Sequence, residues 1–184
     1  MMILGIDPGP THCGFVVYDS TAQRVIESHK KIEIVEAITG IDIYAGRVGL
    51  VAIEMVQSYG IAGASLLQTA RSAGRLEQAA QGLRLPTRLI YRREVLRALD
   101  VTGKGNRDAL VRQRLIEMHG GERRAAQGTK KAPGPLYGVA SPAWAALAVA
   151  VAAQEGTRGA QPDEDESETR ATSTAPRLGA SRCC

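Results

Sequence analysis

The stretch that most constrains the fold is residues 2–18, MILGIDPGPTHCGFVVY. Two apolar runs are separated by a short segment rich in Pro and Gly, which is typical of two strands joined by a tight turn. Asp7 stands at the end of the first predicted strand, where Pro8 and Gly9 restrict the backbone. A carboxylate on such a rigid element is a suitable ligand for a divalent cation. An Asp before Pro also starts turns, so the pattern alone leaves a purely structural role for Asp7 open.

Glu54 repeats this arrangement further along the chain. Residues 48–54, VGLVAIE, form an almost continuous apolar run that ends in the acid. Such runs are typical of strands buried on both faces of a parallel sheet, and functional sites gather at the ends of these strands. Glu54 is therefore a second candidate ligand, and a surface carboxylate at a strand exit is the alternative.

The remaining apolar patterns predict an α/β fold. Further strands are expected at residues 24–28 and 86–91, and helices at residues 31–39, 64–81, 108–119 and 143–154. Three adjacent strands followed by alternating strands and helices predict a mixed five-stranded sheet flanked by helices.

The composition divides the chain into two parts. From Gly156 onward it changes to Ser, Thr, Pro, Gly and charged residues. Such a composition does not bury enough apolar surface to fold. We therefore expect one domain over residues 1–155 and a disordered polar tail over residues 156–184, in which the terminal Cys183 and Cys184 lack the polybasic neighbour of a lipidation signal.

The positive charge is concentrated in one segment. The formal net charge is +4, and residues 92–131 alone contain eleven Lys or Arg against five Asp or Glu. A basic segment of this kind favours an anionic partner such as nucleic acid.

The sequence gives no sign of a membrane protein. The longest apolar run, residues 143–153, is too short to span a bilayer, and the first residues lack the basic start of a targeting segment. The three cysteines have no metal-ligand spacing. A reducing cytoplasm is the expected location.

The predicted helix over residues 64–81 has one polar face. Gln68, Arg71 and Arg75 recur at three- and four-residue spacing, so they lie along one side of the helix and are able to follow a phosphate backbone. A solvated helix face is the commoner explanation of such a pattern. Tyr59 precedes this helix as an aromatic residue in a Gly-containing loop.

Four blocks of sequence are specific as a set, although each one alone is weak. They are GIDPGPTHCGFVVYD at residues 5–19, AIE at 52–54, QTARSAGR at 68–75 and SPAWAALAVAVA at 141–152. Together they resemble the RuvC-type Holliday-junction resolvases of the RNase H-like superfamily. A further stretch, GTKKAPGPLYGV at residues 128–139, resembles the phage-borne members of that family.

The resemblance implies a homodimeric, Mg²⁺- or Mn²⁺-dependent endodeoxyribonuclease that cleaves branched DNA in recombination or phage DNA processing. In that family an Asp and a Glu at strand ends hold two metal ions, and Asp7 and Glu54 match them. Two cations suit phosphodiester hydrolysis because one activates water and the other stabilises the leaving oxygen. The resemblance also makes Tyr59 a candidate for stacking on an unpaired base. The candidate DNA contacts are Gln68, Arg71, Arg75, Arg92, Arg93 and Lys104.

The chain departs from the family pattern in its last helix. Where the family carries a His or Asp and then an Asp one turn later, this sequence has Pro142 and Ala145, and neither residue binds a metal. Asp108, at the start of a predicted helix in the basic segment, is the candidate replacement ligand.

Two alternatives follow from the residues. The loss of an acid favours a junction- or DNA-binding protein of the same fold whose cleavage is impaired. The segment DPGPT at residues 7–11 also resembles the phosphate loop of actin- and sugar-kinase-like ATPases. Those proteins enclose a nucleotide between two such domains, whereas this chain would supply one.

Overall fold

The centre of the structure is a mixed five-stranded sheet with the strand order β3-β2-β1-β4-β5. The computed structural model describes residues 1–58, 60–103 and 105–158. The strands are β1 (Met2–Pro8), β2 (His12–Asp19), β3 (Arg24–Glu33), β4 (Val48–Met55) and β5 (Thr87–Tyr91). β1, β2 and β3 pair antiparallel, whereas β4 is parallel to both β1 and β5. The predicted mixed five-stranded sheet is confirmed.

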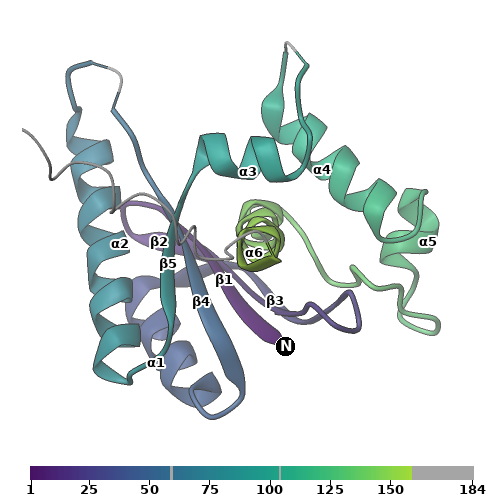
Figure 1. Cartoon of the computed structure of the whole chain (residues 1–184), viewed down its shortest axis with the longest axis horizontal. Helices are drawn as coiled ribbons and strands as arrows, with labels where there is room; N and C mark the ends of the chain where they lie inside the picture. The colour runs from purple at the N-terminus through teal and green to yellow at the C-terminus, as the bar shows by residue number, and fades with distance from the viewer. Residues whose placement is uncertain (59, 104, 159–184) are drawn as a thin grey trace, which may run out of the picture.

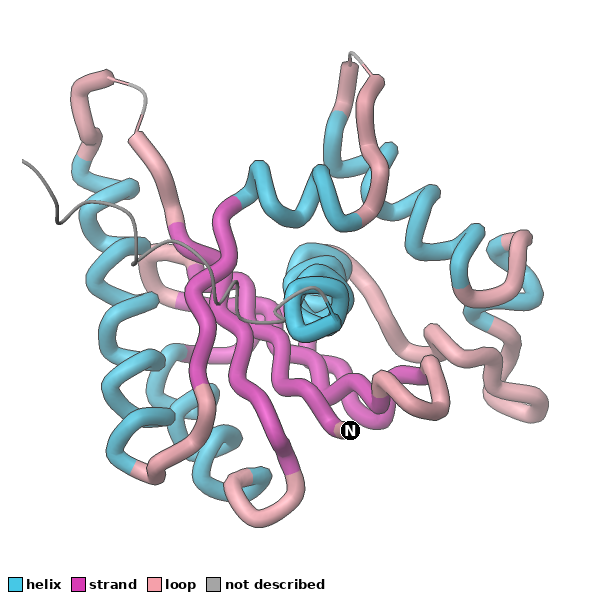
Figure 2. Tube along the Cα trace, viewed as in Figure 1, coloured by secondary structure: helices cyan, strands magenta, loops and turns pink. Residues whose placement is uncertain are grey.

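Helices cover both faces of this sheet (Figure 1). The helices are α1 (Ile34–Tyr44), α2 (Ala64–Gly82), α3 (Arg92–Ala98), α4 (Arg107–Met118), α5 (Arg123–Gln127) and α6 (Ala143–Arg158). Figure 2 shows α1 and α2 on one face of the sheet and α6 on the other. α3 and α4 pack against α6, and α5 packs against α4. Within the described residues, none of these helices is both long and apolar enough to span a membrane.

The central strands are apolar on both sides because each side faces a separate core. On β1, Ile3 packs into the core beneath α6, and the next residue, Leu4, packs into the core beneath α1 and α2. Successive side chains of a strand point to opposite faces, so a strand covered on both faces needs a continuous apolar run. This requirement explains why the sequences of β1 and β4 read as they do.

α6 lies directly on the backbone of β1 and β2. A Cβ atom added at Gly5 would lie 2.2 Å from the carbonyl oxygen of Ala146 and 2.9 Å from the Cβ of Ala150. At Gly14 of β2, a Cβ atom would lie 3.1 Å from the carbonyl oxygen of Pro142. The small residues on both elements therefore allow the close approach, and they bring the start of α6 next to the end of β1.

A buried polar contact fixes α4 to the sheet. The Nδ1–H group of His119 donates to the carbonyl oxygen of Leu115 at 2.8 Å, which leaves Nε2 to accept from the hydroxyl of Tyr18 at 2.9 Å. Tyr18 lies on β2, so this contact joins the carboxyl end of α4 to the centre of the sheet.

Two helices differ from the expectation. α3 and α5 lie in parts of the basic segment for which the sequence pattern predicts no helix. Both are short, and each buries an apolar residue, Val95 in α3 and Ala126 in α5. Tertiary packing of this kind is invisible in the local pattern.

The last element of the described chain is α6. α6 continues to Arg158, and residues 159–184 lie outside the described part of the chain. The boundary at residue 155 and the disordered tail stay predictions.

Candidate functional site

Two acids meet where β1 and β4 end. Ile6 of β1 is paired with Ile53 of β4 in the parallel ladder, so the next residues, Asp7 and Glu54, lie side by side near the carboxyl ends of the two strands. On its other side Asp7 is paired with Gly14 of β2, which has no side chain to occupy the space beside the carboxylate. The register of the sheet therefore creates the pair that the sequence predicts.

The surroundings of these two carboxyl groups disfavour a double negative charge. Burial raises the pKa of Asp7 to about 6, although the guanidinium of Arg92 opposes the shift. Burial, assisted by the charge of Asp7, raises the pKa of Glu54 to about 7. A cation bound between the two would remove this repulsion. Two hard, partly buried carboxylates thus fit the ligand preference of Mg²⁺ or Mn²⁺.

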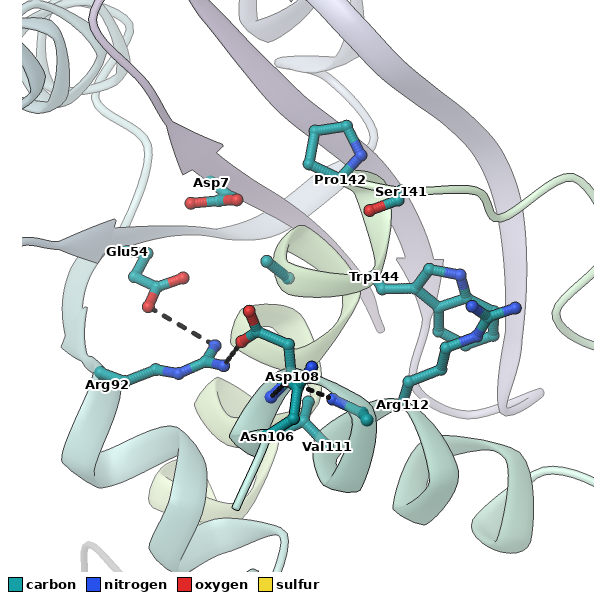
Figure 3. Close-up of a pocket in the computed structure, with 12 residues that line it drawn as sticks. Asp7, Glu54, Arg92, Asn106, Asp108, Val111, Arg112, Ser141, Pro142 and Trp144 are labelled. Atoms are coloured by element: carbon teal, nitrogen blue, oxygen red, sulfur yellow. Dashed lines mark hydrogen bonds and ion pairs between the residues drawn. The ribbon is translucent and has the colours of Figure 1, made fainter.

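The pair forms one wall of a pocket of about 470 Å³. Figure 3 shows this pocket between the ends of β1 and β4, the first turns of α3 and α4, and the start of α6. The lining residues are Asp7, Glu54, Arg92, Asn106, Asp108, Ala109, Val111, Arg112, Ser141, Pro142, Trp144 and Ala145.

Arg92 is the cation that pairs with a strand-end acid of the pocket in the described part of the chain. It follows β5 directly, and β5 is the neighbour of β4 in the sheet. One guanidinium nitrogen lies 3.8 Å from Glu54 Oε1, and another forms an ion pair with Asp108 (Figure 3). The sequence predicts Arg92 as a contact to DNA phosphate, and its place between two acids of the pocket is not part of that prediction.

Asp108 lies in the same pocket as Asp7 and Glu54, on the first turn of α4. Asn106 caps this helix, because its side-chain oxygen accepts from the backbone N–H groups of Asp108 and Ala109 at 3.1 and 3.2 Å. The Asp108 side chain is 85% exposed and is paired with Arg92. Its role as a metal ligand stays a prediction.

α6 contributes no metal ligand of the expected kind. Pro142 and Ala145 line the pocket in the positions where the resemblance predicts acids or His. Within the described residues, no three Asp, Glu, His or Cys side chains are grouped closely enough to hold a metal ion. The donor set that fits an ion is the pair Asp7 and Glu54.

The predicted DNA contacts do not all gather at the pocket. Gln68, Arg71 and Arg75 are exposed on α2, which covers the face of the sheet opposite to α6. Arg93 is also exposed, and its guanidinium lies 5.4 Å from the centre of the Tyr91 ring. The predictions for Tyr59 and Lys104 concern residues outside the described part of the chain.

Sequence reasoning missed Asn106, Arg112 and Trp144 as pocket residues. Trp144 is not among the predicted site residues, but the centre of its ring lies 5.0 Å from the Arg112 guanidinium on the pocket wall. A signal for Arg112 is present in the sequence, because it follows Asp108 by one helical turn and so shares a face of α4 with it.

Two solved structures of Thermus thermophilus RuvC resemble this chain. No protein-family model and no curated protein matches its sequence. RuvC in complex with a Holliday junction substrate matches with a TM-score of 0.59 and 21% identity over 86% of this chain and 96% of that one. A second RuvC structure matches with a TM-score of 0.60 and 21% identity over 85% and 98%. The chain therefore has the fold of RuvC, an RNase H-like mixed sheet flanked by helices.

Proposed function

We propose that this protein is a metal-dependent endodeoxyribonuclease that cleaves branched DNA, with Asp7 and Glu54 as metal ligands. The observation that carries the proposal is the meeting of these two acids in a pocket with Arg92 and Arg112. The fold supports it, because one of the RuvC structures that share this fold is a complex with a Holliday junction substrate.

The proposed reaction is hydrolysis of a phosphodiester. A water oxygen bonds to phosphorus while one P–O ester bond breaks. The water loses a proton to solvent, and the departing oxygen gains one, so the products are a terminal phosphate and a hydroxyl group. Mg²⁺ or Mn²⁺ held by Asp7 and Glu54 would supply a bound water with a lowered pKa and would neutralise charge at the phosphate.

The residues of the chain have separate tasks in this scheme. Asp7 and Glu54 are held rigidly by the ends of two central strands, so they need no rearrangement to hold the ion. Arg112, on the outer wall of the pocket, is placed to pair with a phosphate of the DNA backbone. We include a homodimer in the proposal, because symmetric resolution of a four-way junction requires two equivalent cuts.

A second candidate is a junction-binding protein that does not cleave. Pro142 and Ala145 in the pocket favour it, because a ligand is missing from the place where the resemblance predicts one. The two candidates share the fold and DNA binding, and they differ only in the chemical step.

Cleavage of a labelled four-way junction, compared with a linear duplex of the same arm sequence, tests the proposal. With Mg²⁺ or Mn²⁺ we expect nicking of the junction, and we expect Asp7→Asn to slow it about 100-fold or more because a metal ligand is lost. Binding without cleavage under either metal supports the second candidate. Equal affinity for junction and duplex would contradict both.

A further inference from the structure

We propose that Arg92 takes the place of a second metal ion in this site. The inference rests on the proposed nuclease function and deepens it, because it names the group that supplies the second positive charge. The resemblance predicts two ions, whereas the pocket provides two adjacent strand-end acids with the guanidinium of Arg92 beside them.

The position of Arg92 follows from the sheet. β5 is parallel to β4, with Glu54 paired to Ile90 and Met55 paired to Tyr91. Arg92 is the next residue and begins α3. The Glu94 carboxylate accepts from the backbone N–H of Tyr91 at 2.8 Å, which fixes the first turn of the helix. The guanidinium is therefore delivered to the pocket by an ordered element.

The charges around Arg92 are those that a second cation would meet. Its guanidinium lies 3.8 Å from Glu54 on one side and is paired with Asp108 on the other. Only 31% of the side chain is exposed. One divalent ion on Asp7 and Glu54, together with Arg92, would balance all three acids of the pocket.

The opposite wall has no ligands for a second ion. Pro142, which directly precedes α6, and Ala145, in the first turn of α6, line the pocket there, and neither side chain binds a metal. A second metal ion beside the start of α6 would have to keep most of its water shell. The guanidinium of Arg92 is tethered to α3 and needs no ligand from α6. The lack of metal ligands at the start of α6 is therefore compatible with Arg92, and not a second ion, supplying the positive charge.

The chemistry also suits a guanidinium. Negative charge develops on the phosphoryl and departing oxygens during hydrolysis, and preorganised donors aimed at this charge accelerate the reaction. A guanidinium carries five N–H donors in a plane, which matches two phosphate oxygens. Arg92 donates hydrogen bonds and keeps its protons throughout, so no bond to it forms or breaks. Asp108 acts as a positioning residue that holds the guanidinium from the exposed side.

Manganese stoichiometry tests this inference without any cleavage. We expect Mn²⁺ titration of the full chain, followed by electron paramagnetic resonance, to give one bound ion per chain. Ala145→Asp alone should leave the count at one because Arg92 still occupies the second position. The double variant Ala145→Asp with Arg92→Ala should bind two. Two ions in the wild-type chain, or in Ala145→Asp alone, would overturn the inference.

Single-turnover cleavage supplies the second test. At saturating Mn²⁺, Arg92→Ala should slow junction cleavage about 100-fold, the range expected when a donor to the transition state is lost. Arg92→Lys should recover part of the rate, because it keeps the charge without the planar fork. Arg97→Ala is the matched control, since it removes one exposed positive charge from the same helix and lies outside the pocket.

Junction affinity separates catalysis from binding. Measured in chains that also carry Asp7→Asn, it should change less than about threefold on Arg92→Ala if the arginine acts mainly in the transition state. Equal losses of affinity and rate would overturn the inference, as would cleavage at the wild-type rate. If the wild-type chain does not cleave at all, the nuclease proposal fails, and the manganese count still decides the role of Arg92.

Discussion

Burial keeps protons on Asp7 and Glu54 at pH values where exposed carboxyl groups are ionised. The pKa of Asp7 rises from 3.8 to about 6, and that of Glu54 rises from 4.5 to about 7. Arg92 lowers both values but does not cancel the effect of burial. Without metal, ionising Asp7 and Glu54 lowers the free energy of unfolding. A cation bound to the two carboxylates would offset this loss.

The stability of the metal-free protein should therefore depend on pH. Between the unfolded values near 4 and the folded values of about 6 and 7, the folded chain binds more protons than the unfolded chain. The free energy of unfolding should then fall as pH rises from about 4 to about 7. Glu54→Gln should make this decrease in the free energy of unfolding smaller by on the order of 2 kcal/mol, since one pKa unit corresponds to about 1.4 kcal/mol. Urea denaturation in EDTA at pH 5 and pH 8 measures the difference.

The control for this measurement is Glu122→Gln, at an exposed site outside the pocket. Burial lowers the pKa of His119, so its contribution runs the other way: stability is lost as pH falls below 6.5. That contribution is the same in the variant and in the wild-type chain, and it cancels in the comparison. Equal pH dependence in Glu54→Gln and wild type would contradict the prediction.

The sequence allows some of these residues to be found and hides others for a physical reason. Asp7 and Glu54 each end an apolar run, and the end of a strand is a local property that a pattern shows. The place of Arg92 depends on which strand lies beside β4, and that is a long-range property. The same holds for Trp144, whose contact with Arg112 joins α6 to α4.

Among the elements, the strands and the longer helices are predictable because their apolar periodicity is strong. α2 and α4 lie within a residue of their expected bounds. β3 extends to Glu33 and α1 begins after it, because pairing with β2 continues into a stretch whose own pattern is ambiguous. α3 and α5 are too short to be stable alone and depend on packing against the rest of the fold.

The contact between β1 and α6 has a direct test in Gly5→Ala. The added Cβ atom would lie 2.2 Å from the carbonyl oxygen of Ala146, so α6 must move away from the sheet. Overpacking of this kind should lower the free energy of unfolding by about 2 to 3 kcal/mol. Chemical denaturation at constant pH measures the loss.

Gly74→Ala is the matched control for this change. Gly74 is exposed in α2, and an added Cβ atom there has no heavy atom within 4 Å. The same substitution should therefore raise the free energy of unfolding by about 0.5 to 1 kcal/mol, since Ala favours a helix over Gly. A loss at both positions would show that the effect of Gly5→Ala is not specific to the helix–sheet contact.

At the scale of the whole molecule, the site opens at one end of the sheet. The carboxyl ends of β1 and β4 and the amino ends of α2 and α4 all lie at this end (Figure 1). α2 and α4 belong to opposite faces of the sheet. If branched DNA binds at this end, the exposed Arg71 and Arg75 of α2 are candidates for phosphate contacts in addition to the pocket.

Salt dependence of junction binding tests whether α2 takes part. Each phosphate contact that releases a counterion contributes about 0.9 to the slope of log affinity against log salt concentration on duplex DNA. Arg71→Ala combined with Arg75→Ala should thus lower the slope by about 2 and weaken binding most at low salt. Fluorescence anisotropy with a labelled junction, in chains that carry Asp7→Asn to prevent cleavage, gives both quantities.

Arg123→Ala combined with Arg124→Ala removes the same charge from α5, which follows the end of α4 remote from the pocket. If DNA follows α2, the double substitution in α5 should leave the slope nearly unchanged, because Arg123 and Arg124 then contact no phosphate and release no counterion. If both pairs lower the slope equally, the effect is one of net charge, and α2 carries no defined path for the backbone. The comparison of the two double variants thus distinguishes defined phosphate contacts on α2 from the general attraction of a basic protein to DNA. The net charge read from the composition does not distinguish these two cases.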